Sequence, residues 1–166
     1  MFITFAVIAT LQQFTAALAA QLPAFPGAVG QGAAASGGRG GDVYHVINLL
    51  DYSSDKSESE IKGSLRHAIE SAMGPRTIVF DVGGAIQLHD RLEIRKSNLT
   101  IAGQTAPSGI TVWGYPVEVS KASDVVIRYL RVRTGDFNAK APPDSAAHAA
   151  GGNGAKDLDA GSANSL

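Results

Sequence analysis

The 166-residue sequence contains no cysteine. It can therefore form no disulfide framework, no thiolate zinc site and no cysteine nucleophile. Charged residues are also few, at 17% of the chain, and the formal net charge is −1. A nucleic-acid partner needs a concentrated basic face, so this balance argues against one. The 45% of hydrophobic residues indicates a globular chain, long enough for one domain with a core.

A long apolar run is absent too, because the uncharged stretch at residues 2–11 is too short to cross a bilayer. Small residues follow it, and Ala17-Leu18-Ala19 has the A-x-A pattern of a cleavage site. We predict that residues 1–20 are a secretory signal peptide, that residues 21–166 form one domain, and that the protein is secreted and extracellular. No Lys or Arg precedes the apolar run, which departs from the usual signal peptide, and the alternatives are a buried N-terminal helix or a mis-assigned start codon.

Short runs of β-branched and aliphatic residues fill the stretch from 77 to 136, and turn residues separate them. No segment between these runs has the apolar spacing of a helix. The pattern predicts many short strands without crossover helices, in an all-β fold. The runs lie at residues 78–80, 92–94, 99–101, 110–112, 117–119, 125–127 and 130–132.

Two architectures fit these strands, an antiparallel sandwich and a parallel β-solenoid. No Asn-Gly or Asp-Gly pair joins two runs, so hairpins are disfavoured. The runs also repeat: the run at 99–101 follows the run at 78–80 by 21 residues, and the run at 117–119 follows the run at 92–94 by 25. One solenoid coil needs roughly 20 to 30 residues, so the spacing favours the solenoid.

One helix and one further strand are predicted before these runs. Residues 42–50 alternate between apolar and polar side chains, as a first strand does. Residues 61–72 place their apolar side chains on one helical stripe, with Ser64 as the N-cap and Gly74-Pro75 as the stop. We expect this helix, within residues 61–74, to cover the open apolar end of the first coil.

Five sequence blocks in this order resemble the N-terminal part of the secreted pectate lyases of polysaccharide lyase family 1. The more specific blocks are IAGQTAP and VIRYLRVR, at residues 101–107 and 126–133. The resemblance implies a right-handed parallel β-helix, an extracellular setting, and β-elimination on polygalacturonate or a related acidic polysaccharide with calcium as cofactor. The five blocks occupy residues 24–49, 63–69, 74–88, 97–119 and 124–136.

The resemblance also implies that the chain is an N-terminal fragment. Family members are longer, and their catalytic arginine and most calcium ligands would follow Leu166, so we expect no catalytic residue here and no activity from this chain alone. Asp159 or, in another register, Asn164 matches the family's D-A-[LI] calcium segment, and both are our candidate metal ligands. Solvated loop positions are the alternative for these two residues and for the other aspartates of the tail, at 136, 144 and 157.

Arg131 and Arg133 are the candidate substrate-binding residues. Side chains two apart on a strand share a face, so the pair would present a cationic row to a polyanionic sugar chain. Outward solvated charges are the alternative. The four histidines, at 45, 67, 89 and 148, lack metal-ligand spacing.

The sequence thus resembles part of a secreted, monomeric pectate lyase. A non-catalytic carbohydrate-binding β-helix is the first alternative, favoured by an asparagine in place of the calcium-site aspartate. A structural β-solenoid is the second, although structural solenoids of this kind show more regular repeats than this chain does.

Overall fold

The computed structural model describes residues 22–54 and 58–134. Within them the strands are short, as the β-branched runs predicted, and helices are few. The elements are η1 (Gln31–Ala34), β1 (Asp42–Val46), α1 (Leu65–Glu70), β2 (Arg76–Phe80), β3 (Gly84–Gln87), β4 (Leu92–Ile94), β5 (Leu99–Ala102), η2 (Gly103–Thr105), β6 (Ile110–Trp113), β7 (Val117–Val119), β8 (Val125–Arg128) and β9 (Leu130–Arg133).

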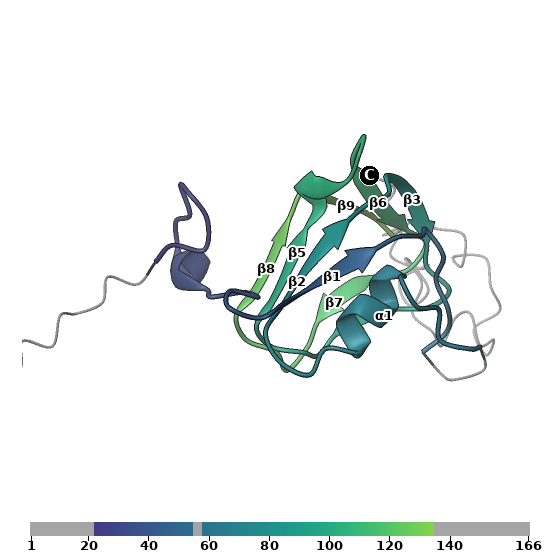
Figure 1. Ribbon diagram of the computed structural model, residues 1–166, viewed down its shortest axis with the longest axis horizontal. Coiled ribbons are helices and arrows are strands. Elements are labelled where there is room, and N and C mark those ends of the chain that lie inside the picture. The colour runs from purple at the N-terminus through teal and green to yellow at the C-terminus, as the bar shows by residue number, and fades with distance from the viewer. Residues whose placement is uncertain (1–21, 55–57, 135–166) are drawn as a thin grey trace, which may run out of the picture.

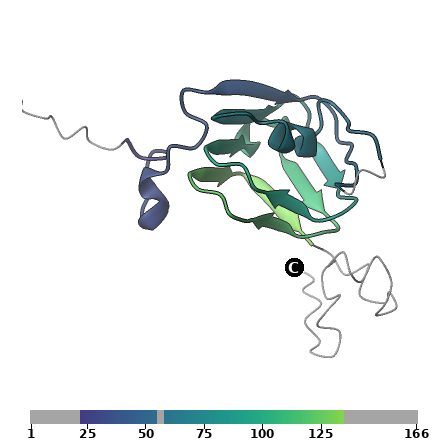
Figure 2. The ribbon, with the colours of Figure 1, turned by 90° about the horizontal axis from the view of Figure 1, so that it is seen from below.

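The strands form three sheets in which every pairing is parallel. The first sheet has the order β1-β2-β5-β8, the second β3-β6-β9 and the third β4-β7. The chain therefore visits the sheets in the same order twice, through β2-β3-β4 and then β5-β6-β7, before it adds β8 and β9. Figure 1 shows the strands of the first sheet side by side, and Figure 2 shows them stacked from β1 to β8. The antiparallel alternative is excluded for these strands.

The core lies between the three sheets. Alternate side chains of each strand point inward, so aliphatic residues stack on aliphatic residues in the next strand. Ile78 of β2 pairs with Ile101 of β5, and Ile86 of β3 pairs with Val112 of β6. All four are fully buried. This in-register stacking replaces the helix packing that covers most parallel sheets.

The predicted helix is present but shorter than expected. It begins at Leu65, and Ser64 caps it by accepting a hydrogen bond from the His67 amide at 3.2 Å. Gly63 immediately before it has a φ of 80°, a turn conformation that favours glycine and excludes an earlier start. Helix α1 packs against β1, β2 and β4. The helix therefore spans Leu65–Glu70, whereas residues 61–72 were predicted.

The segment before β1 crosses the outer side of the first sheet. The Ser36 amide donates to Asp124 Oδ1 at 3.0 Å, and the Gly38 amide donates to Thr100 Oγ1 at 2.9 Å. A Cβ at Gly38 would collide with the Arg76 carbonyl, so the close approach requires glycine there. The glycine-rich composition of this segment thus serves contact with the sheet. In the described part of the chain, no helix has the length and apolar character of a membrane span.

Candidate functional site

The two candidate arginines lie on β9, in the second sheet. Arg131 pairs with Thr111 of β6, and Arg133 pairs with Trp113. Ile110 and Val112, which alternate with these two partners along β6, point into the core. Both guanidinium groups therefore belong to the outward face, and both residues are exposed. Among residues 22–54 and 58–134, neither has an ion-pair partner. Within the described ranges, β9 thus presents two positive charges that have no ion-pair partner.

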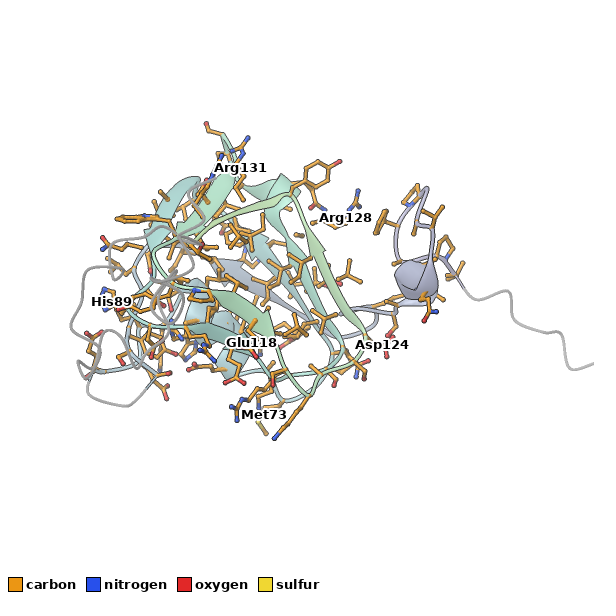
Figure 3. All side chains as sticks on the ribbon, turned by 180° about the vertical axis from the view of Figure 1, so that it is seen from behind. Met73, His89, Glu118, Asp124, Arg128 and Arg131 are labelled. Carbon is orange, nitrogen blue, oxygen red and sulfur yellow. The ribbon has the colours of Figure 1, made fainter. Side chains whose placement is uncertain are left out.

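Arg128 lies close to these arginines in sequence but in a different sheet. Tyr129, with a φ of 55°, turns the chain from β8 in the first sheet to β9 in the second. The Arg128 guanidinium carbon is 4.3 Å from the centroid of the Phe25 ring and 5.2 Å from that of Tyr129. Figure 3 shows Arg128 and Arg131 toward the same edge of the molecule, away from Met73. The single run DVVIRYLRVR is therefore a corner between two sheets.

The third sheet carries a second charged surface, on which acidic and basic side chains form ion pairs. Glu93 of β4 accepts from Arg95 at 2.7 Å, and Arg91 donates to Glu118 of β7 at 3.1 Å. The hydrogen bond from Arg95 holds the pKa of Glu93 below its ordinary value. A hollow of about 580 Å³ adjoins these pairs; its lining residues are Ser54, Arg66, Ile69, Glu70, Arg91, Glu93, Arg95 and Lys96. In these two pairs each arginine is matched by a glutamate, whereas Arg131 and Arg133 have no ion-pair partner among the described residues.

A buried ion pair forms one wall of this hollow. Arg66 on α1 donates from Nε and Nη2 to the two carboxylate oxygens of Asp51, both at 2.8 Å. Arg66 also donates to the carbonyls of Asp90 and Arg91. Asp90 Oδ1 lies 2.9 Å from Arg66 Nη2 but is not aligned for a hydrogen bond. The sequence did not predict this pair, because Arg66 lies at a position where the polar side of an amphipathic helix is expected.

The candidate calcium ligands Asp159 and Asn164 lie outside the described residues, as do the other aspartates of the tail. Within the described ranges, no three histidine, aspartate or glutamate residues come together to hold a metal ion.

Each of the described histidines contacts a different side chain. His45 contacts Asp81 at 2.9 Å, His67 contacts the Tyr44 hydroxyl at 2.8 Å, and His89 contacts a glutamate carboxylate at 2.8 Å.

Comparisons with known proteins give one consistent result. The chain is 51% identical over 115 residues to a probable pectate lyase C of Emericella nidulans, which covers 69% of this chain and 25% of that protein. It is 45% identical over 130 residues to a probable pectate lyase C of Aspergillus fumigatus, covering 78% and 28%. The chain thus spans about a quarter of the length of these relatives. No family model matches it.

One solved structure has a similar backbone over part of this chain. The crystal structure of Jun a 1, the major allergen from cedar pollen, superposes with a TM-score of 0.54 at 28% identity. The match covers 63% of this chain and 29% of the allergen.

Proposed function

The chain belongs to the pectate lyase family, and from that premise we propose that it is part of a secreted enzyme that cleaves polygalacturonate by calcium-assisted β-elimination. The observation that carries this proposal is the similarity to the fungal pectate lyase C proteins over most of the chain. The parallel three-sheet arrangement supports it, because a related structure has a similar backbone.

We propose further that the described strands are coils of a right-handed parallel β-helix and that α1 covers one end of it. The repeated order of the three sheets supports the first part. The second is supported by the packing of α1 on β1, β2 and β4, where Leu65 and Ile69 are buried. An exposed apolar end would otherwise invite association with other chains.

β-Elimination breaks the C4–oxygen bond of a uronate after its C5 proton is removed. The proton is weakly acidic, so a positive charge near the adjacent carboxylate must stabilise the negative charge that develops. Calcium is a hard cation that binds carboxylate oxygens, and we propose Asp159 and Asn164 as its ligands in this chain. We assign no catalytic residue among residues 1–166. An Asp159→Ala variant of the full-length protein that keeps its calcium affinity would reject the Asp159 assignment.

The role we propose for Arg131 and Arg133 is to attract the polyanionic substrate. Both are exposed on β9 and lack ion-pair partners among the described residues. Exposed cations on one face raise the encounter rate with a polyanion, an effect that salt screens. They therefore fit substrate capture at low ionic strength.

We also propose that residues 1–20 are a signal peptide and that the protein is an extracellular monomer. The chain is, in this proposal, part of a longer parent protein. N-terminal sequencing of the secreted protein tests the first point. A mature protein that begins near Ala20 or Gln21 supports cleavage, and an intact Met1 on the secreted form rejects it.

The function is tested by sequencing the coding DNA beyond Leu166 and assaying the longest reading frame for unsaturated uronate. Product formation supports the lyase. Retention on polygalacturonate without product supports the carbohydrate-binding alternative, for which Asn164 in the calcium segment is the specific observation. Absence of both supports a structural solenoid.

A further inference from the structure

An exposed tyrosine occupies a strained position at the corner between the first and second sheets. Tyr129 has a φ of 55° and is 66% exposed. The left-handed region is unfavourable for a bulky side chain and is occupied readily by glycine or asparagine. The ring is not part of the buried core. Asn98, Ser108, Lys121 and Asp124 have the same backbone conformation, so the feature that points toward a binding role is the exposed aromatic ring and not the strain.

Tyr129 borders an open hollow of about 390 Å³, lined also by Gly103, Gln104, Ala106, Gly109, Leu130 and Arg131. Two glycines of the lining lie in close contact with Tyr129 and Arg131. A Cβ at Gly103 would collide with the Tyr129 carbonyl, and a Cβ at Gly109 would lie 2.9 Å from Arg131 Nη1. The Arg131 guanidinium therefore lies against Gly109 at the side of the hollow. The lining combines an aromatic ring, a guanidinium group and the exposed amide of Gln104.

The charge around the hollow is positive. The Arg128 guanidinium carbon lies 5.2 Å from the centroid of the Tyr129 ring, and its second contact is the Phe25 ring. In the described ranges, neither Arg128 nor Arg131 forms an ion pair. The hollow thus favours an anion that also has an apolar face. It lies apart from the charged surface of the third sheet, since Figure 3 shows Arg131 and Glu118 in different regions.

We propose that Tyr129, Arg131 and Gln104 form a binding site for one acidic sugar unit. The apolar C–H face of a uronate ring would stack on Tyr129, as sugars and other flat ligands use aromatic platforms. The guanidinium of Arg131 matches a carboxylate in a bidentate geometry, and the Gln104 amide can bond the sugar hydroxyls. Arg128 also contacts the Tyr129 ring. The choice of an acidic sugar rests on the proposed function, whereas the site itself is defined by the hollow.

The site is tested by measuring the binding of a galacturonate oligomer to the 166-residue chain in the presence of a chelator, with a neutral galactose oligomer as the comparison. Tyr129→Gly removes the ring and relieves the left-handed strain, so the variant keeps its melting temperature or gains in it. We expect Tyr129→Gly and Arg131→Gln each to weaken binding about tenfold, the loss expected for one stacking contact in the first variant and for one charge-assisted hydrogen bond in the second. The matched control is Lys121→Gln, which removes an exposed positive charge in the turn between β7 and β8 and leaves binding unchanged.

Binding of the galacturonate oligomer that Tyr129→Gly leaves unchanged would overturn the proposal, as would equal affinity for the neutral oligomer or no binding at all. The result is separate from the lyase proposal. A longer reading frame without product, combined with Tyr129-dependent binding, would reject the enzyme and keep this site. Product formation with unchanged binding in Tyr129→Gly would keep the enzyme and reject this site.

Discussion

Arg66 and Asp51 form a bidentate ion pair in which each side chain is only 1% exposed. The pair joins α1 to the loop that follows β1, and Asp51 Oδ2 also accepts from the His89 amide at 2.9 Å, just before β4. Three separate segments are therefore fixed by one carboxylate. A buried charge that loses its partner is costly, so the position of α1 on the strands depends on both residues.

Asp51→Ala tests this dependence. The substitution leaves the Arg66 guanidinium buried without a carboxylate, and we expect the free energy of unfolding to fall by about 3–5 kcal/mol. Urea denaturation at pH 7 measures it. The control is Asp81→Ala, which removes the exposed partner of His45 and should cost less than about 1 kcal/mol. Equal losses in the two variants would contradict a special role for the buried pair.

Asp42→Asn tests the pH dependence of stability. Arg76 donates to Asp42 from Nε at 2.9 Å and from Nη2 at 2.7 Å, and these bonds hold the pKa of Asp42 below its ordinary value of 3.8. A lowered pKa means that the ion pair contributes stability above the unfolded pKa, and that this contribution is lost as the pH falls through the folded pKa. The Asp42 side chain is 58% exposed, so the contribution at pH 7 should stay below about 1 kcal/mol.

We therefore expect Asp42→Asn to melt below the wild type at pH 7, and the difference to shrink as the pH is lowered below the ordinary pKa. Melting temperatures of both proteins across this range measure it. A difference that stays constant with pH, or grows in acid, would show that the Asp42 charge does not act through Arg76.

Gly83→Ala tests the close stacking of successive turns. A Cβ at Gly83 would collide with the Pro107 carbonyl in the loop before β6, and a backbone carbonyl cannot move aside as the end of a flexible side chain can. We expect a loss of about 1–3 kcal/mol in the free energy of unfolding. Gly74→Ala is the matched control, because nothing lies within 4 Å of its Cβ. Similar unfolding curves for the two variants would contradict the stacking.

The strands could be predicted because β-branched residues recur where the chain is extended, and all seven predicted runs are strands or lie within them. The strand β3 was missed, because it begins at Gly84 and glycine reads as a turn. The pairing offset between β2 and β5 is 23 residues, since Ile78 pairs with Ile101, whereas the two apolar runs are 21 residues apart. The difference arises because β2 begins at Arg76, two residues before its apolar run, and β5 begins with its run. Pairing register depends on hydrogen bonds between strands, which the apolar pattern marks only in part.

The residues of the candidate site likewise include some that the sequence predicted and some that it did not. Arg131 and Arg133 could be found because two cations recur with strand periodicity. Tyr129 could not, because its strained corner arises where β8 and β9 join different sheets and no local pattern marks that division. The Arg66–Asp51 pair was invisible for a related reason, since the two residues come together only when α1 packs on the strands. The calcium candidates Asp159 and Asn164 remain predictions.

The most direct test of whether this chain is part of a pectate-cleaving enzyme is the formation of unsaturated uronate. The longest reading frame that contains residues 1–166 should be incubated with polygalacturonate, once with calcium and once with a chelator, and the absorbance of the product followed. We expect product with calcium and none with the chelator. A folded full-length protein that gives no product under either condition would contradict the account.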